Sequence, residues 1–142
     1  MYNNNSNSRY KQTTKIHTSK YTTNENFTNK SPFNPFDKNI WGPKTWDIMH
    51  TFSYNYPQNP DLHTQQNAFN FYTSIGYLLP CSYCQQHCIQ YVTDNPPTIN
   101  SRNELIQWVL TFHNEVSKKL NKETWTITRL NKKYETDNAF CS

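Results

Sequence analysis

Apolar residues concentrate in four stretches of the chain, and in each the spacing is helical. The first runs from about Gly42 to Pro57, and its apolar stripe consists of Trp46, Ile48, Met49, Phe52, Tyr54 and Tyr56. A second helix is expected over residues 62–79, with its inward face formed by Phe69, Tyr72, Ile75, Leu78 and Leu79. Pro80 suits the first turn of a third helix, which stops before Pro96 and Pro97.

The fourth stretch has the clearest helical pattern. Ser101 and Glu104 form a capping box, in which each side chain can bond a backbone N–H of the other residue. The apolar positions that follow at helical spacing are Leu105, Trp108, Val109, Phe112, Val116 and Leu120. A short element is expected over residues 125–130. The pattern predicts an all-α fold, a four-helix bundle with a short fifth helix.

Residues 1–30 differ from the rest of the chain in composition. They are rich in Asn, Ser, Thr and Lys, with no Leu or Val and a single Ile, so they cannot bury enough apolar surface to offset the entropy of ordering. Five basic residues and one acidic residue in this segment account for the whole net charge of +4. We expect a disordered basic tail over 1–35, a folded domain over 36–130 and a C-terminal tail over 131–142. A solvated tail is the favoured interpretation over specific nucleic-acid or membrane binding.

The chain shows no sequence signal for a membrane or secretory route. No apolar run approaches the ~20 residues of a membrane span, and residues 1–30 lack the apolar region of a signal peptide. We therefore expect a cytosolic protein, and in the cytosol a Cys-x-x-Cys motif is more often catalytic or metal-binding than structural.

Cys81 and Cys84 form such a motif at the start of the third helix. Unpaired N–H groups and the helix dipole favour a thiolate there, and the thiolate is the reactive species in disulfide exchange. The alternative is a zinc site made by both cysteines with His87 or Cys88 and with His113, although no second motif completes a standard ligand pattern.

Two histidines mark a possible cofactor slot between helices. Trp46, His50 and Tyr54 share one face of the first helix, and His113 lies on the fourth helix with Asn114 and Ser117 close in sequence. Each histidine alone is as easily explained as an ordinary interior or surface residue. The chain has only two glycines, which excludes a glycine-rich phosphate turn. A dinucleotide would therefore have to lie between helices, with Lys119 and Lys122 available for its phosphates.

Three ordered motifs resemble the Erv/ALR family of FAD-linked sulfhydryl oxidases. They are residues 41–57 (WGPKTWDIMHTFSYNYP), 80–84 (PCSYC) and 105–122 (LIQWVLTFHNEVSKKLNK). The compact format is similar to that of the short members encoded by large DNA viruses. In that case the setting would be the host cytoplasm and the virion.

The resemblance implies a bundle that holds FAD between its helices, usually as a homodimer. It assigns Cys84 to the cysteine beside the flavin and Cys81 to the one that exchanges with protein dithiols or a thioredoxin-like carrier, with O2 as the final acceptor and H2O2 as its product. It places around the cofactor Gly42, Trp46, His50, Tyr54, His113, Asn114, Val116, Ser117, Lys119, Lys122 and Trp125. A family member that acts only as a structural partner is the remaining alternative.

The sequence departs from the family pattern at several positions. Ser117 replaces the usual Asn, and Thr93 and Ile127 stand where many members have a second cysteine pair. Asn121 replaces a Gly at a position where Asn can also adopt a left-handed conformation. Cys88 is interpreted as a small buried hydrophobe, and no role is assigned to Cys141.

Overall fold

The computed structural model describes residues 33–135, and all the regular structure in this range is helical. The helices are α1 (Lys38–Asn55), α2 (Leu62–Ser74), the 3-10 turn η1 (Ile75–Leu78), α3 (Ser82–Asp94), α4 (Arg102–Lys119) and α5 (Ile127–Tyr134). The predicted all-α fold of four helices and a short fifth is confirmed. Of the tail expected over 1–35, residues 1–32 lie outside the described part of the chain, as does Cys141. Helix α5 continues four residues beyond the domain boundary expected at 130.

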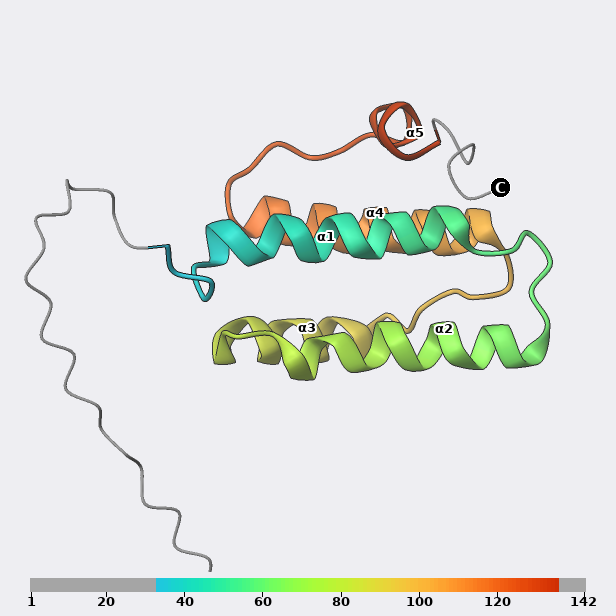
Figure 1. Cartoon of the computed structure of the whole chain (residues 1–142), viewed down its shortest axis with the longest axis horizontal. Coiled ribbons are helices and arrows are strands. Elements are labelled where there is room, and N and C mark those ends of the chain that lie inside the picture. The colour runs from blue at the N-terminus through green and yellow to red at the C-terminus, as the bar shows by residue number, and fades with distance from the viewer. Residues whose placement is uncertain (1–32, 136–142) are drawn as a thin grey trace, which may run out of the picture. The chain divides into compact units, whose positions relative to one another are not determined.

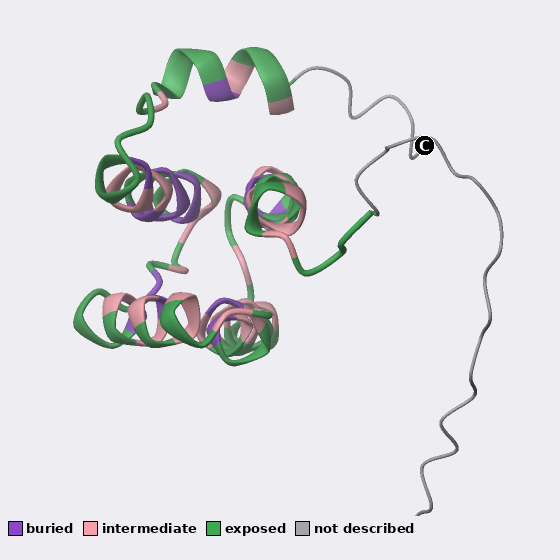
Figure 2. Ribbon diagram, turned by 90° about the vertical axis from the view of Figure 1, so that its left-hand side faces the viewer, coloured by how far each residue is buried: buried purple, intermediate pink, exposed green. Residues whose placement is uncertain are grey.

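The four longer helices form two layers. Figure 1 shows α1 beside α4 and α2 beside α3, with α5 following a long connection from the end of α4. Viewed nearly along the helices, buried positions turn toward the space that the four helices enclose (Figure 2). The starts of α1 and α3 and the end of α4 lie at the same end of this bundle (Figure 1).

Side-chain caps set the helix boundaries. Asp37 accepts a hydrogen bond from the backbone N of Asn39 at 2.8 Å, and Ser101 accepts one from Glu104 N at 3.3 Å. Such caps contribute about 1 kcal/mol each. Because Asp37 caps α1, this helix begins at Lys38, four residues before the start predicted at about Gly42, and Pro43 falls inside it.

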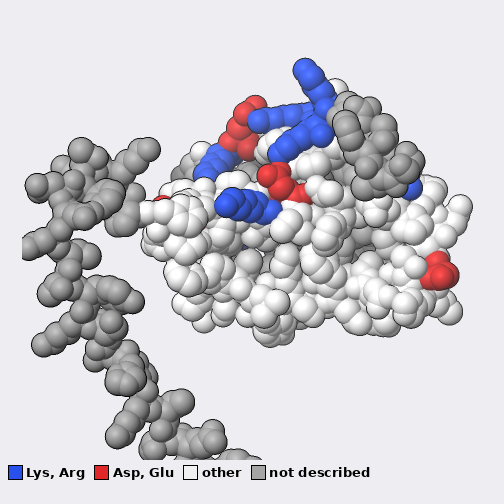
Figure 3. Space-filling model, in the orientation of Figure 1, with Lys and Arg blue, Asp and Glu red and all other residues white. Residues whose placement is uncertain are grey.

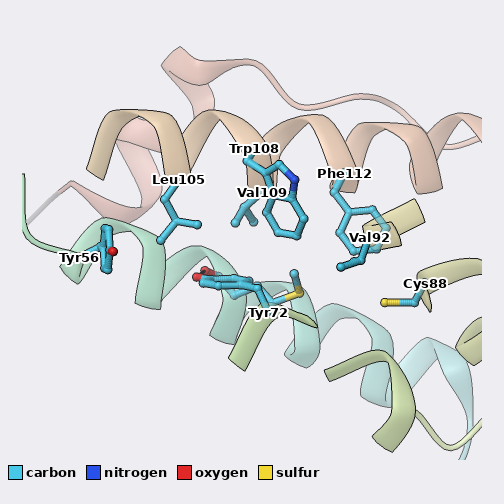
Figure 4. Packing of buried hydrophobic residues seen from close by; sticks show 9 residues of the cluster. Tyr56, Tyr72, Cys88, Val92, Leu105, Trp108, Val109 and Phe112 are labelled. Atoms are coloured by element: carbon cyan, nitrogen blue, oxygen red, sulfur yellow. Dashed lines mark hydrogen bonds between the residues drawn. The ribbon is translucent and has the colours of Figure 1, made fainter. Parts of the chain in front are cut away.

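The core lies between α4 and the other three long helices. Leu105, Trp108, Val109 and Phe112 of α4 are all buried, as their spacing predicted (Figure 4). The buried Tyr72 hydroxyl of α2 donates to the carbonyl of Met49 at 2.8 Å, which ties α2 to α1 without leaving a polar atom unsatisfied.

The apolar stripe expected on α1 was partly wrong. Ile48 and Phe52 are about half exposed, whereas His50 and Ser53 are buried. Helix α1 packs on α4 through the face that carries Met49, His50 and Ser53, so the apolar residues one position away turn outward.

The helix expected over 62–79 was also partly wrong. It ends at Ser74 and continues as the tighter turn η1, which packs on α3. A Cβ on Gly76 would lie 2.9 Å from Cys88 Sγ, so this close packing depends on glycine. Leu78, expected to face inward, is 82% exposed.

Candidate functional site

The Cys81–Cys84 pair forms a disulfide at the start of α3, with its Cα atoms 5.2 Å apart. Cys81 is the N-cap residue, and its Sγ accepts a hydrogen bond from Cys84 N at 3.2 Å. The sequence analysis placed Pro80 in the first turn of this helix. That prediction was wrong, because Pro80 precedes the cap residue. After reduction, this N–H and the helix dipole stabilise a Cys81 thiolate.

Cys88 is buried one turn after Cys84 and makes no disulfide. Burial raises the pKa of its thiol to about 11, so it stays protonated at neutral pH. The interpretation of Cys88 as a small buried hydrophobe is confirmed.

Two histidines meet between α1 and α4. His50 Nε2 and His113 Nδ1 are 2.9 Å apart, and the His113 ring stacks on Trp46 with centroids 4.3 Å apart and planes 9° apart. The structure thus brings together Trp46 and His50 of α1 and His113 of α4, the residues that the sequence grouped, and their rings are in direct contact.

Burial keeps both imidazoles neutral. Desolvation, followed by the charge of the neighbouring histidine, lowers the pKa of His50 to about 3. Desolvation, followed by the nearby Lys133 charge, lowers the pKa of His113 to about 4. One ring nitrogen of this contact donates to the other, in a direction set by the tautomers, and His50 Nδ1 is left as the sole buried side-chain polar atom without a partner among residues 33–135.

These residues fit a flat aromatic group that forms hydrogen bonds. The orphaned His50 Nδ1 can donate or accept, depending on its tautomer. A Cβ on Gly42 would meet no atom of the described chain within 4 Å, so the side of α1 there is open to a close approach. The indole of Trp46 adds an aromatic face.

The side chain of Asn114 makes two hydrogen bonds to the backbone of Trp125. Its amide donates to the Trp125 carbonyl at 2.8 Å and accepts from the Trp125 N–H at 2.7 Å. These two bonds fix the connection after α4 and bring the Trp125 ring to 5.8 Å from that of His113.

Helix α5 supplies residues that the sequence analysis missed. Tyr134 stacks on His50 with centroids 5.3 Å apart, and Tyr54 donates to Asn131 at 2.6 Å. Tyr134 and Lys133 both bond Asp47 of α1, which fastens the end of α5 to the bundle. Leu130 and Tyr134 lie four residues apart and so share one face of a helix. This spacing in the sequence could have indicated that the last helix extends to Tyr134.

The end of α4 carries the remaining predicted residues. Val116 is half-buried and Ser117 is buried, whereas Lys119 and Lys122 are exposed. Asn121 has φ 53°, so the left-handed conformation expected there is confirmed.

Lys119 links this end of α4 to the helix of the disulfide. Its Nζ lies 3.2 Å from Nδ1 of His87, one turn after Cys84. The cysteine pair therefore lies at the end of the bundle that carries Lys119 and the start of α1 (Figure 1).

The zinc alternative finds no support in this arrangement. Cys81 and Cys84 are bonded to each other, and His113 stacks on Trp46. Within residues 33–135, no group of three or more His, Cys, Asp or Glu side chains is placed to hold a metal ion.

None of the helices in the described part of the chain has the length and apolar character needed to cross a membrane.

Comparison with known proteins gives concordant matches. A model of the Erv1/Alr family matches residues 43–135. An FAD-linked sulfhydryl oxidase of African swine fever virus (isolate Pig/Kenya/KEN-50/1950) is 32% identical over 95 residues, which cover 67% of this chain and 80% of the viral protein. The mitochondrial FAD-linked sulfhydryl oxidase ERV1 of Saccharomyces cerevisiae is 31% identical over 88 residues, 62% of this chain and 47% of that protein. The crystal structure of the yeast Erv1 core superposes with a TM-score of 0.69 at 26% identity, covering 75% of this chain and 90% of the other.

Proposed function

Because this chain belongs to the Erv1/Alr family, we propose that it is an FAD-linked sulfhydryl oxidase that introduces disulfides into protein substrates. The observation that carries the proposal is the Cys81–Cys84 disulfide at the capped start of α3, at the end of the bundle that carries the predicted Gly42 and Lys119 positions. A disulfide in that position is the oxidant that a dithiol substrate requires.

The cofactor would lie between α1, α4 and the connection to α5. We assign to its site Gly42, Trp46, His50, Tyr54, His113, Asn114, Val116, Ser117, Lys119, Lys122 and Trp125. His50 and His113 would offer neutral hydrogen-bonding groups, Trp46 an aromatic face, and the two lysines positive charge for phosphates. When bound, FAD supplies a two-electron acceptor for the reduced cysteine pair and delivers the electrons to O2, giving H2O2.

The chain's own chemistry is thiol–disulfide exchange in two steps. A substrate thiolate attacks Cys81 Sγ, so a substrate–Cys81 bond forms while the Cys81–Cys84 bond breaks and Cys84 leaves as a thiolate. The second substrate thiolate then attacks the substrate sulfur of this mixed disulfide and releases Cys81 as a thiolate. The substrate has gained a disulfide and lost two electrons to the cysteine pair and two protons to solvent.

The position of each cysteine supports this division of roles. Cys81 precedes the helix, and the Cys84 N–H that bonds its Sγ stabilises the thiolate released in the second step. Cys84 lies one turn before the buried Cys88, on the face of α3 that leads into the bundle.

We further infer that the enzyme works as a homodimer. Ile48 of α1 is about half exposed, as is Phe52, whose ring lies 5.2 Å from that of Phe71 of α2. An apolar surface shared by two helices suits contact with a second copy. Since relatives of this chain are viral proteins, we also propose that it acts in a host cytoplasm or in a virion, on client dithiols or through a thioredoxin-like carrier.

Anaerobic mixing of the FAD-loaded protein with a dithiol peptide tests the assigned roles. The wild type should lose the absorbance of its oxidised flavin, and Cys84→Ser should abolish this loss. Cys81→Ser should block turnover with protein thiols while leaving Cys84 able to contact the flavin.

Cys88→Ala is the matched control, because it removes a thiol of the same helix that takes no part in the exchange. It should retain flavin reduction. Equal, mild effects of Cys81→Ser and Cys84→Ser would contradict the division of roles.

A further inference from the structure

Three apolar side chains are exposed around the reactive disulfide. Leu78 is 82% exposed, Tyr83 69% and Tyr77 63%. Tyr83 stands between the two cysteines, while Tyr77 and Leu78 belong to η1, which packs on α3. We call Tyr77, Leu78 and Tyr83 the apolar patch.

A rigid frame holds this patch beside the disulfide. The Gln85 side chain, on the first turn of α3, donates to the carbonyl of Leu79 at 2.8 Å and to that of Tyr77 at 3.3 Å. Gly76 of η1 is in turn buried against Cys88 of α3. The position of Tyr77 and Leu78 relative to the disulfide is thus fixed by hydrogen bonds and packing between η1 and α3.

The chain segment that contains the patch carries no formal charge of its own. No Asp, Glu, Lys or Arg occurs between residues 62 and 93, which include all of α2 and η1 and nearly all of α3. In the view of Figure 3, the part of the molecule formed by α2 and α3 shows no Lys or Arg, whereas these residues gather on the side of α5. One positive charge from another helix borders this surface, since Lys119 of α4 lies 3.2 Å from His87, whose ring packs edge-on against Tyr83.

We propose that the apolar patch docks an uncharged, apolar segment of the client polypeptide next to its reactive cysteine. This inference rests on the proposed thiol oxidase function and names the class of substrate for it. A client thiolate that attacks Cys81 brings its neighbouring residues alongside η1 and Tyr83. Burying one side chain of leucine size there is sufficient for about a tenfold preference.

Two dithiol peptides of equal length probe this preference. One carries Leu and Phe beside its cysteines, and the other carries Glu and Lys at the same positions. Dithiothreitol serves as a third substrate, which carries no apolar side chain for the patch to bind. For the wild type, kcat/KM should be about tenfold higher with the apolar peptide than with the charged one. Equal values would overturn the proposal.

Leu78→Ser tests the patch directly, and Leu62→Ser is its matched control. Leu62 is 83% exposed at the opposite end of α2. The measured quantity is the ratio of kcat/KM for the apolar peptide to kcat/KM for dithiothreitol. We expect this ratio to fall about tenfold in Leu78→Ser and to stay at the wild-type value in Leu62→Ser.

The outcomes distinguish a failure of the proposed thiol oxidase function from a failure of the docking proposal. If the wild type oxidises neither dithiothreitol nor peptide, the proposed function fails. If dithiothreitol is oxidised but the ratio is unchanged in Leu78→Ser, or falls equally in Leu62→Ser, the docking proposal fails alone. Conversion of a wild-type dimer to a monomer by Leu78→Ser would also overturn it, because a second copy would then cover the patch.

Discussion

At the scale of single residues, the polar centre of the site is a pair of neutral histidines, His50 and His113. Their contact at 2.9 Å joins α1 to α4, and neither ring has a carboxylate as its hydrogen-bond partner. A protonated pair would place two positive charges side by side in a desolvated space. Desolvation disfavours the charged form of each ring and lowers the pKa of both, which gives folding a defined dependence on pH.

The free energy of unfolding should fall as the pH falls below about 6.5. An unfolded histidine takes up a proton near pH 6.5, whereas folded His50 and His113 stay neutral down to about pH 3 and 4. Between these values the unfolded state binds more protons, so each histidine costs about 1.4 kcal/mol of stability per pH unit, or roughly 2 kcal/mol between pH 6.5 and 5.

Urea unfolding at a series of pH values measures this slope. His50→Gln should flatten it, and the control His63→Gln, on the exposed surface of α2, should leave it unchanged. A wild-type stability that is constant from pH 6.5 to 5 would contradict the neutral pair.

Individual residues of the candidate site could be predicted from the sequence where helical spacing places them on one face of a helix. Sequence reasoning grouped Trp46, His50 and His113 correctly, because helical periodicity fixes which positions share a face. It could not anticipate that the Asn114 amide is fully used by the Trp125 backbone, since that bond depends on the path of the connection after α4.

At the scale of elements, the junction of η1 and α3 positions the reactive disulfide. Gly76 allows the two elements to approach, and a Cβ there would lie 2.9 Å from Cys88 Sγ and 3.3 Å from Cγ1 of Ile89. The Gln85 bonds then lock the approach. The first turn of α3, with both cysteines, takes its place from this contact.

Gly76→Ala should destabilise the fold by about 1–3 kcal/mol, because the added methyl group overpacks the junction. Chemical denaturation of Gly76→Ala, Cys88→Ala and the double variant measures the contact. The double variant should lose less free energy of unfolding than the two single variants lose together, by at least about 0.5 kcal/mol, since removal of Sγ relieves the clash. Strict additivity would contradict direct packing of Gly76 on Cys88.

The element boundaries show where sequence reasoning was limited. The capping box of α4 and the prolines after α3 gave correct ends, because these signals act locally. The break at Ser74 was missed because the apolar spacing continues through it, and the reason for the break is a contact with α3 that lies outside the local sequence. The end of α5 was missed because Tyr134 belongs to the bundle through Asp47, in a distant part of the chain.

On the scale of the whole molecule, charge and apolar surface are segregated. Basic side chains gather at the end of α4, where Lys119 and Lys122 are proposed to bind the cofactor phosphates, and on α5, whereas residues 62–93, which contain the disulfide and the apolar patch, carry no charged residue. The sequence predicted the all-α bundle and the redox pair. The apolar patch was not predicted, because a leucine at a helical position is indistinguishable from a core residue until its surroundings are known.

Oxygen uptake by the FAD-loaded protein is the most direct test of whether the Cys81–Cys84 pair passes electrons from a dithiol substrate to O2. With a reduced dithiol peptide in limiting amount, an oxygen electrode combined with assays for free thiols and H2O2 gives the stoichiometry. We predict one O2 consumed and one H2O2 formed for each disulfide produced, with no uptake in Cys84→Ser. Peptide oxidation that proceeds equally well in Cys84→Ser, or a wild type that binds FAD but consumes no oxygen, would contradict it.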